Sequence, residues 1–232
     1  MGLFVRLAIK PDRIAPGQWR EVYEESLALL QGYPGEMMGH ESVITDSGEK
    51  ALHTKNLEHH PDDPVQRHWH VVGDWGSKQH CESFIFYYDL AHYRSKERTP
   101  QSRDNKADDI LVSMVERKQD VAYVLFNKTD RQPYHIPMLA VAMLVEDRFP
   151  TYAHVHGDIN FDEARRAQAL AKSILKRLIT LPLIVSASRL LERLQQHYPR
   201  QEAVTHFHDF FYGEYTETVE RLLQGEPQNR LL

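Results

Sequence analysis

Cysteine is nearly absent from this chain. One residue of the 232, Cys81, is a cysteine, so no internal disulfide can form and packing must stabilise the fold. Such usage is typical of a reducing compartment, and we expect a cytoplasmic protein. Long apolar runs are missing too: no stretch approaches the roughly 20 apolar residues that cross a bilayer, and we expect no membrane partner.

A strong excess of positive charge is also lacking. The 28 Lys and Arg residues against 33 Asp and Glu residues give a net charge of −5, which repels a polyphosphate backbone at long range. Nucleic acid is therefore a disfavoured partner. The sequence contains no glycine-rich phosphate loop, paired-cysteine zinc motif, Gly-x-Ser-x-Gly elbow or helical His-Glu-x-x-His motif. Whether the chain is an enzyme stays open.

The composition does provide for a packed core. Hydrophobic residues make up 41% of the chain and charged residues 26%, which are ordinary values for a globular protein. A length of 232 residues is near the upper limit for one hydrophobic core. We expect a single α+β domain over 1–232, with a sheet-containing part at 1–157 and a helical C-terminal part at 158–225.

Hydrophobic spacing predicts the first elements. Over 3–10, apolar residues alternate with their neighbours, which is typical of a strand with one buried face. Over 16–31 they recur at helical spacing, bounded by proline and glycine. The segment 78–93 also shows helical spacing, at Cys81, Phe84, Ile85 and Tyr88, and predicts a second helix.

The middle of the chain predicts a sheet. Residues 121–126, 136–145 and 151–156 are rich in β-branched, aromatic and apolar side chains, and only short turns connect them. Parallel neighbours would need crossovers of about a dozen residues or more, so three consecutive antiparallel strands are expected. The predicted fold is α+β, with an antiparallel, meander-containing sheet, helices packed mainly on one face and a helical C-terminal third.

The C-terminal third predicts several helices. Asn160 and Glu163 have the spacing of a capping box, in which each side chain accepts from the other residue's backbone amide. Apolar residues continue at helical spacing to about residue 178. Further apolar groups at 190–194, 203–211 and 219–223 predict shorter helices.

Histidine is unusually frequent, with 14 residues, and three pairs have the pattern His-x-His. On a strand, such a pair projects both rings from one face roughly 6–7 Å apart, a geometry that metal sites use. The metal-ligand candidates are His154, His156, Asp158, His68 and His70. About one such pair is expected by chance, so ordinary surface or half-buried histidines are the alternative. The third pair, His206 and His208, falls on a predicted helix whose geometry points the rings apart.

Two other groups of residues can form a docking surface. The interval 161–200 holds eight Lys and Arg residues against three Asp and Glu residues, and aromatic residues crowd the predicted helix at 78–93. Such groups are also found on solvated helix faces or between packed layers. The partner-binding candidates are Phe86, Tyr87, Tyr93, Arg165 and Arg166.

These observations support two main functions. The first is a non-enzymatic protein-interaction module without a cofactor, such as a bacterial immunity, adaptor or regulatory subunit, with homo-oligomerisation also open. The alternative is a metal-dependent hydrolase or metal-binding protein that uses a His/Asp cluster and a divalent transition metal such as zinc. Convergence of the strands carrying His68 and His154 favours the alternative. A third hypothesis, nucleic acid binding by the basic helical face, is testable through its salt dependence.

Overall fold

The chain folds into antiparallel sheets and α-helices, which confirms the predicted α+β class. A computed structural model describes residues 3–35, 37, 39–44, 50–54, 56–74, 76–94 and 108–225, with the backbone alone at 39–44 and 50–54. The strands are β1 (Phe4–Ile9), β2 (Gly39–Ile44), β3 (Lys50–Thr54), β4 (Glu58–His59), β5 (His68–Asp74), β6 (Gln79–Tyr87), β7 (Ala122–Lys128) and β8 (Ala153–Gly157). The α-helices are α1 (Pro16–Gln31), α2 (Ile110–Val115), α3 (His135–Arg148), α4 (Phe161–Leu175), α5 (Ala187–Gln195), α6 (Arg200–Phe210) and α7 (Glu217–Gln224). Short 3₁₀ turns are η1 (Pro11–Arg13), η2 (Leu90–Tyr93) and η3 (Leu183–Val185).

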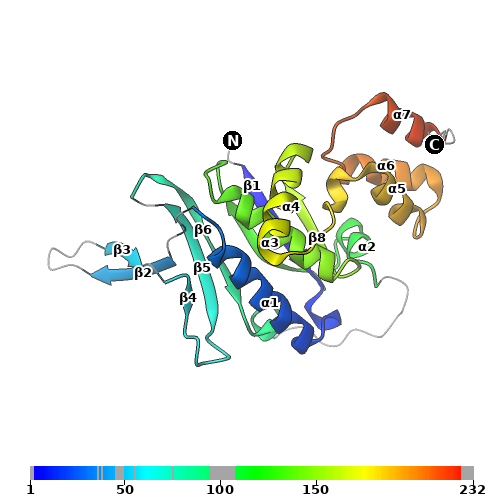
Figure 1. The fold of residues 1–232 in the computed structure, drawn as a ribbon. Coiled ribbons are helices and arrows are strands. Elements are labelled where there is room, and N and C mark those ends of the chain that lie inside the picture. The colour runs from blue at the N-terminus through cyan, green and yellow to red at the C-terminus, as the bar shows by residue number, and fades with distance from the viewer. Residues whose placement is uncertain are drawn as a thin grey trace.

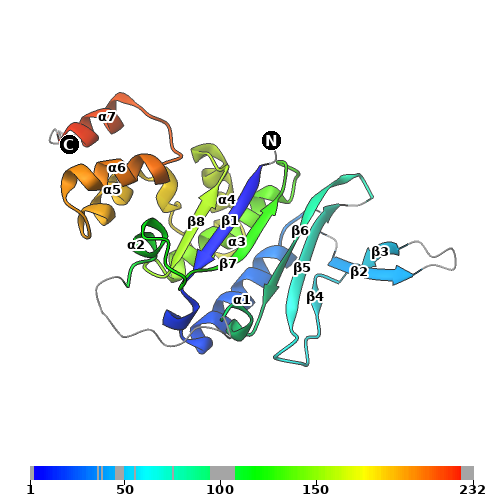
Figure 2. The same cartoon turned by 180° about the vertical axis from the view of Figure 1, so that it is seen from behind.

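Two of the three sheets among the described residues lie edge to edge and together form one layer. One sheet has the order β7-β1-β8, a second has the order β4-β5-β6, and β2 pairs with β3. Strand β6 lies beside β7, where the Lys128 amide donates to a Glu82 carboxylate oxygen at 2.8 Å. Helices α1, α3 and α4 cover one face of this layer (Figure 1). Figure 2 shows the opposite face, with the strands in front and the C-terminal helices α5–α7 to one side.

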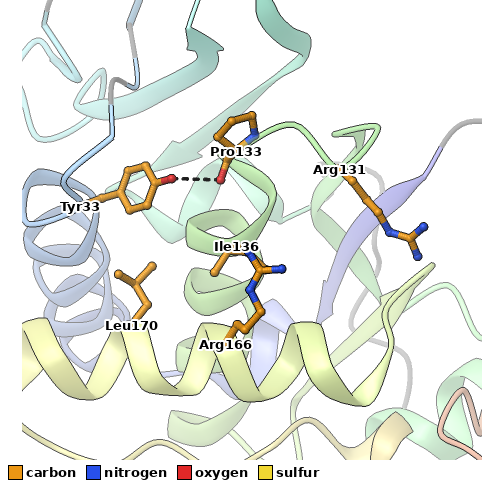
Figure 3. A pocket seen from close by; sticks show the side chains of 6 residues that line it. All are labelled: Tyr33, Arg131, Pro133, Ile136, Arg166 and Leu170. Atoms are coloured by element: carbon orange, nitrogen blue, oxygen red, sulfur yellow. Dashed lines mark hydrogen bonds between the residues drawn. The ribbon is translucent and has the colours of Figure 1, made fainter.

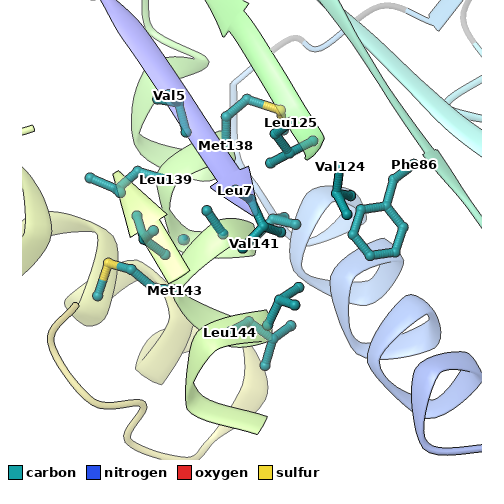
Figure 4. Close-up of a cluster of buried hydrophobic side chains, with 14 of the residues drawn as sticks. Val5, Leu7, Phe86, Val124, Leu125, Met138, Leu139, Val141, Met143 and Leu144 are labelled. Carbon is teal, nitrogen blue, oxygen red and sulfur yellow. The ribbon is translucent and has the colours of Figure 1, made fainter. Parts of the chain in front are cut away.

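Helix α3 occupies the centre of the core. Every side chain from Pro137 to Glu146 is buried. The helix lies under β1, so that Val5 and Leu7 face Met138 and Val141 (Figure 4). Since an α-helix satisfies its own backbone hydrogen bonds, it can be surrounded by apolar groups without leaving polar atoms unpaired.

Helix α1 packs its aromatic residues against the second sheet. The Trp19 ring stacks on Phe86 of β6, with centroids 4.8 Å apart, and Phe86 stacks on Trp69 of β5 at 5.2 Å. The Trp19 indole N–H donates to the Tyr87 carbonyl at 3.0 Å. Aromatic stacking over a large buried area therefore joins α1 to β5 and β6.

Several predicted elements are confirmed. The strand at 3–10 is β1, the helix at 16–31 is α1, and the strands at 121–126 and 151–156 correspond to β7 and β8. The capping box is present: the Asn160 side chain accepts from the Glu163 amide at 2.8 Å, and the Glu163 carboxylate accepts from the Asn160 amide at 3.1 Å. Helices α5, α6 and α7 follow the predicted C-terminal pattern.

Two predicted elements are wrong. The helix predicted at 78–93 is strand β6 followed by η2, because alternate residues such as Phe84 and Phe86 face the core. The strand predicted at 136–145 is helix α3. The meander of 121–126, 136–145 and 151–156 is consequently wrong as well: β7 and β8 pair with opposite sides of β1. The consecutive antiparallel strands are β4, β5 and β6.

The C-terminal helices have a hydrophobic cluster of their own. Leu183, Leu190, Leu194 and Phe207 pack together there, and Leu111 of α2 joins them. Helix α4 instead packs in the main core, against α1 and α3. The division of the chain at residue 157 stays a prediction.

A buried carboxylate connects the two hydrophobic clusters. Glu146, near the end of α3, accepts from the Val155 amide at 3.0 Å and from the Leu183 amide at 3.1 Å. The first amide belongs to β8 and the second to η3, which leads into the C-terminal helices. Removing this carboxylate would leave two buried amides without an acceptor.

We predict that Glu146→Ala lowers the free energy of unfolding by about 3 kcal/mol, because each unpaired buried amide costs roughly 1–3 kcal/mol. Urea unfolding followed by circular dichroism measures the change. Glu192→Ala, at an exposed site on α5, is the control and should shift stability by less than about 0.5 kcal/mol. Equal unfolding midpoints for the two variants would contradict the role given to Glu146.

Candidate functional site

Three neighbouring strands present one set of polar and aromatic side chains on the face opposite α3. In the sheet register, Arg6 of β1 lies between Phe126 of β7 and His156 of β8. Phe4 is paired with Lys128 one step along the strand. Since successive side chains on a strand alternate between faces, Val5 and Leu7 enter the core while these residues face outward. We name this group the outer sheet face: Phe4, Arg6, Tyr123, Phe126, Lys128 and His156.

Arg6 occupies the centre of the outer sheet face. Its guanidinium carbon lies 4.5 Å from the centroid of the Phe4 ring and 4.6 Å from that of Phe126. Both contacts are within the range of cation–π attraction. The Arg6 Nε atom is buried without a hydrogen-bond partner, and no carboxylate of the described residues forms an ion pair with this guanidinium. Arg6 is thus held between two rings, and no carboxylate among the described residues neutralises its charge.

Exposed aromatic rings extend the site. Tyr123 is 48% exposed and Phe126 is 47% exposed, and their ring centroids are 5.0 Å apart. Tyr123 also lies 5.6 Å from the His156 ring. Large apolar side chains that touch one another on a sheet surface form a contiguous patch, in contrast to scattered exposed residues.

The strand β8 places His154 and His156 on one face, as predicted, but the two differ in access. Their rings are nearly parallel, 5.9 Å apart. His154 is 0% exposed, because Phe210 of α6 lies over it with a centroid separation of 5.6 Å. Its Nδ1 is 3.3 Å from a Glu146 oxygen, which is close enough for an ion pair but outside hydrogen-bond geometry.

Asp158 has a structural partner. Its carboxylate accepts from the Phe4 amide at 3.0 Å, while the Asp158 amide donates to the Phe4 carbonyl at 3.0 Å. These two bonds fix the end of β8 to the start of β1. The carboxylate is directed to the backbone of β1 instead of to the two histidines.

The second histidine pair lies elsewhere in the sheet. His68 and His70 are on β5, and strands β6, β7 and β1 separate them from β8. His68 Nδ1 is 2.7 Å from the Gln66 carbonyl, and its ring stacks on His59 at 5.1 Å. The two pairs therefore do not converge. Within the part of the chain that the structure describes, no group of three or more His, Cys, Asp or Glu side chains is placed to hold a metal ion.

The predicted aromatic docking helix does not exist, since its residues belong to β6 and η2. Phe86 is fully buried in the core. The Tyr93 hydroxyl accepts from the Tyr87 amide at 2.9 Å, and the half-buried Tyr87 ring stacks on His92 at 3.9 Å. All three aromatic candidates therefore make contacts within the fold.

The basic candidates are on the surface. Arg165 and Arg166 are both exposed on α4, on the side of the molecule away from the outer sheet face. Arg165 lies over the Phe161 ring at 5.9 Å, whereas Arg166 borders a pocket that Tyr33, Ile136 and Leu170 also line.

Sequence reasoning did not single out Arg6, Phe4, Tyr123 or Phe126. The period-two pattern at 3–10 does indicate that Phe4 and Arg6 share a face. Their neighbours on β7 and β8 come from distant parts of the chain, so only the strand order brings the cluster together.

Comparison with known proteins does not add to this picture: no family model matches the chain, and no curated protein or solved structure is significantly similar to it. Every helix among the described residues is too short or too polar to cross a bilayer. Function must therefore be argued from the side chains and their geometry.

The pH dependence of stability gives a test of the His156 environment. Burial, followed by the charges of His154 and Arg6, lowers the pKa of His156 from 6.5 to about 3. The unfolded chain therefore takes up a proton near pH 6.5 that the folded chain accepts only at much lower pH. We predict that unfolding free energy falls as pH decreases below 6.5, by up to about 1.4 kcal/mol per pH unit for this histidine.

His156→Gln should reduce this slope between about pH 4.5 and 6.5, as measured by urea unfolding at several pH values. Part of the slope should persist, because burial also lowers the pKa of His135. An unchanged slope in the variant would show that His156 does not titrate as its burial requires.

Proposed function

We propose that this chain is a non-enzymatic interaction protein that docks a partner protein on its outer sheet face. The observation that carries the proposal is the guanidinium of Arg6, which lies between two phenylalanine rings on the outer sheet face and has no carboxylate partner among the described residues. Immunity, adaptor and regulatory subunits are the kinds of protein that act through such surfaces. A cytoplasmic location is part of the same proposal.

The side chains on this face have the chemistry of protein interfaces. Arginine, tyrosine and phenylalanine are enriched at interface centres, and arginine and tyrosine are frequent hot spots. Phe126 and Tyr123 supply apolar area that loses contact with water when a partner binds. The strands hold both rings on a rigid support, so that little conformational freedom is lost on docking.

The charges indicate what the partner must present. Lys128 has Glu82 at 3.8 Å, whereas Arg6 has no carboxylate among the described residues. A partner Asp or Glu surrounded by apolar side chains would pair with Arg6 and cover the rings. Nucleic acid fits less well, because the net charge of −5 opposes a polyanion and the face offers few cations for phosphates.

Site-specific photo-crosslinking tests the docking face. A benzophenone amino acid at position 126 should capture a partner protein in cells of the native host, whereas the same group at position 161, on α4, should not. The captured protein is then purified and its affinity measured by calorimetry. We predict that Arg6→Ala weakens binding at least about tenfold, because loss of an interface arginine removes both its ion pair and its packing.

Arg165→Ala is the matched control, since Arg165 also lies over a phenylalanine ring but on α4. It should leave the affinity unchanged. Crosslinking at position 126 to a second copy of this chain or to nucleic acid would overturn the proposal, as would an equal loss of affinity in the two arginine variants.

A further inference from the structure

A pocket lies between three helices on the face away from the outer sheet face. Its volume is about 420 Å³, and its lining comes from the residue after the C-cap of α1, the turn that precedes α3, the first turn of α3 and the side of α4 (Figure 3). The lining residues are Tyr33, Arg131, Pro133, Ile136, Arg166 and Leu170. Pockets of about 300–1,000 Å³ accommodate small organic molecules.

The apolar part of the pocket is held in shape. The Tyr33 hydroxyl donates to the Pro133 carbonyl at 3.1 Å, which fixes the ring beside the start of α3. Ile136 of α3 and Leu170 of α4 lie below this bond in Figure 3. A ligand therefore meets a preformed apolar surface and does not have to order it on binding.

The polar part of the pocket is positively charged. Arg166 rises from α4 toward Ile136, and no carboxylate of the described residues forms an ion pair with it. Arg131 does have a partner: its Nε donates to Glu163 at 2.6 Å. Among the described residues, Glu163 therefore neutralises Arg131, while the Arg166 guanidinium beside Ile136 has no carboxylate paired with it.

Two further features favour an anion at this pocket. The pocket lies at the N-terminal end of α3, where the helix dipole favours an anion. Glu163, the neutralising carboxylate, is largely buried and already bonded to the Asn160 amide at 3.1 Å as part of the capping box. It cannot turn toward Arg166 without breaking the cap of α4.

We propose that this pocket binds a small organic anion, a carboxylate or phosphate monoester attached to an apolar group. The anionic end pairs with Arg166, which can donate two parallel hydrogen bonds to either group. The apolar end lies on Ile136, Leu170 and the Tyr33 ring. This site is independent of the docking proposed at the outer sheet face.

A second pocket shows why an arginine alone does not make such a site. It has a volume of about 610 Å³ and is bordered by Arg200, Val204, His208 and Leu223. The Arg200 guanidinium there donates to the carbonyls of Leu222 and Leu223 at 2.9 and 3.0 Å. Both bonds come from Nη2, which caps the end of α7, so this nitrogen is already directed to the backbone.

Calorimetry with defined probes tests the proposal. We predict saturable binding of phenyl phosphate or benzoate, and no binding of the uncharged analogue benzyl alcohol. Arg166→Gln should weaken binding at least about tenfold, the effect expected for loss of a charge-assisted bidentate contact. Arg165→Gln, one residue earlier on the same helix and outside the lining, should change the affinity less than about twofold. Thermal melts establish that both variants are folded.

Three results would overturn the proposal. The first is no saturable binding of either anion up to about 10 mM, which is weaker than useful recognition. The second is equal weakening by the two arginine substitutions, which would indicate general surface charge. The third is inorganic phosphate binding as tightly as phenyl phosphate, because the apolar surface would then contribute nothing.

Discussion

The burial of α3 on all sides is the constraint on which the rest of this structure depends. A helix with no solvated face must be covered by the sheet on one side and by other helices on the other, and α1 and α4 supply that cover. The sheet therefore commits one face to the core. Its other face carries Arg6 and exposed rings, so the position of α3 determines which face of the sheet is available for the docking that we propose.

The same constraint explains which elements the sequence predicts. Helices α1 and α4 each have one solvent-exposed face, so their apolar residues recur with a helical period. The capping box of Asn160 and Glu163 also marks the start of α4. Helix α3 is apolar all round and has no period, so an apolar run at 136–145 cannot be distinguished from a buried strand. The segment of strand β6 gives a wrong prediction for the opposite reason: Cys81, Ile85 and, just after the strand, Tyr88 follow helical spacing, while the alternate residues Phe84 and Phe86 face the core.

The candidate site is predictable only in part, because local patterns fix the face of a strand but not its neighbours. Period two correctly puts His154 and His156 on the same side of β8. It does not reveal that α6 covers His154, nor that three strands separate β8 from β5. For Arg6 the sequence shows the face but not the neighbours. Alternation places Arg6 on the outer face, and only the pairing of β1 with β7 and β8 brings Phe126 and His156 beside it.

Access and unmet charge are better guides to function in this chain than the abundance of one residue type. Among the described residues, the ring nitrogens of His154 also have no hydrogen-bond partner, but the ring is fully buried and Phe210 of α6 lies against it. The carboxylates of Asp158 and Glu146 already accept hydrogen bonds from backbone amides. Arg6 and Arg166 differ from all three because each combines a charge that no described carboxylate pairs with and a position at the surface. A binding partner can pair with a charge at the surface at little cost in desolvation, whereas it cannot reach a fully buried group.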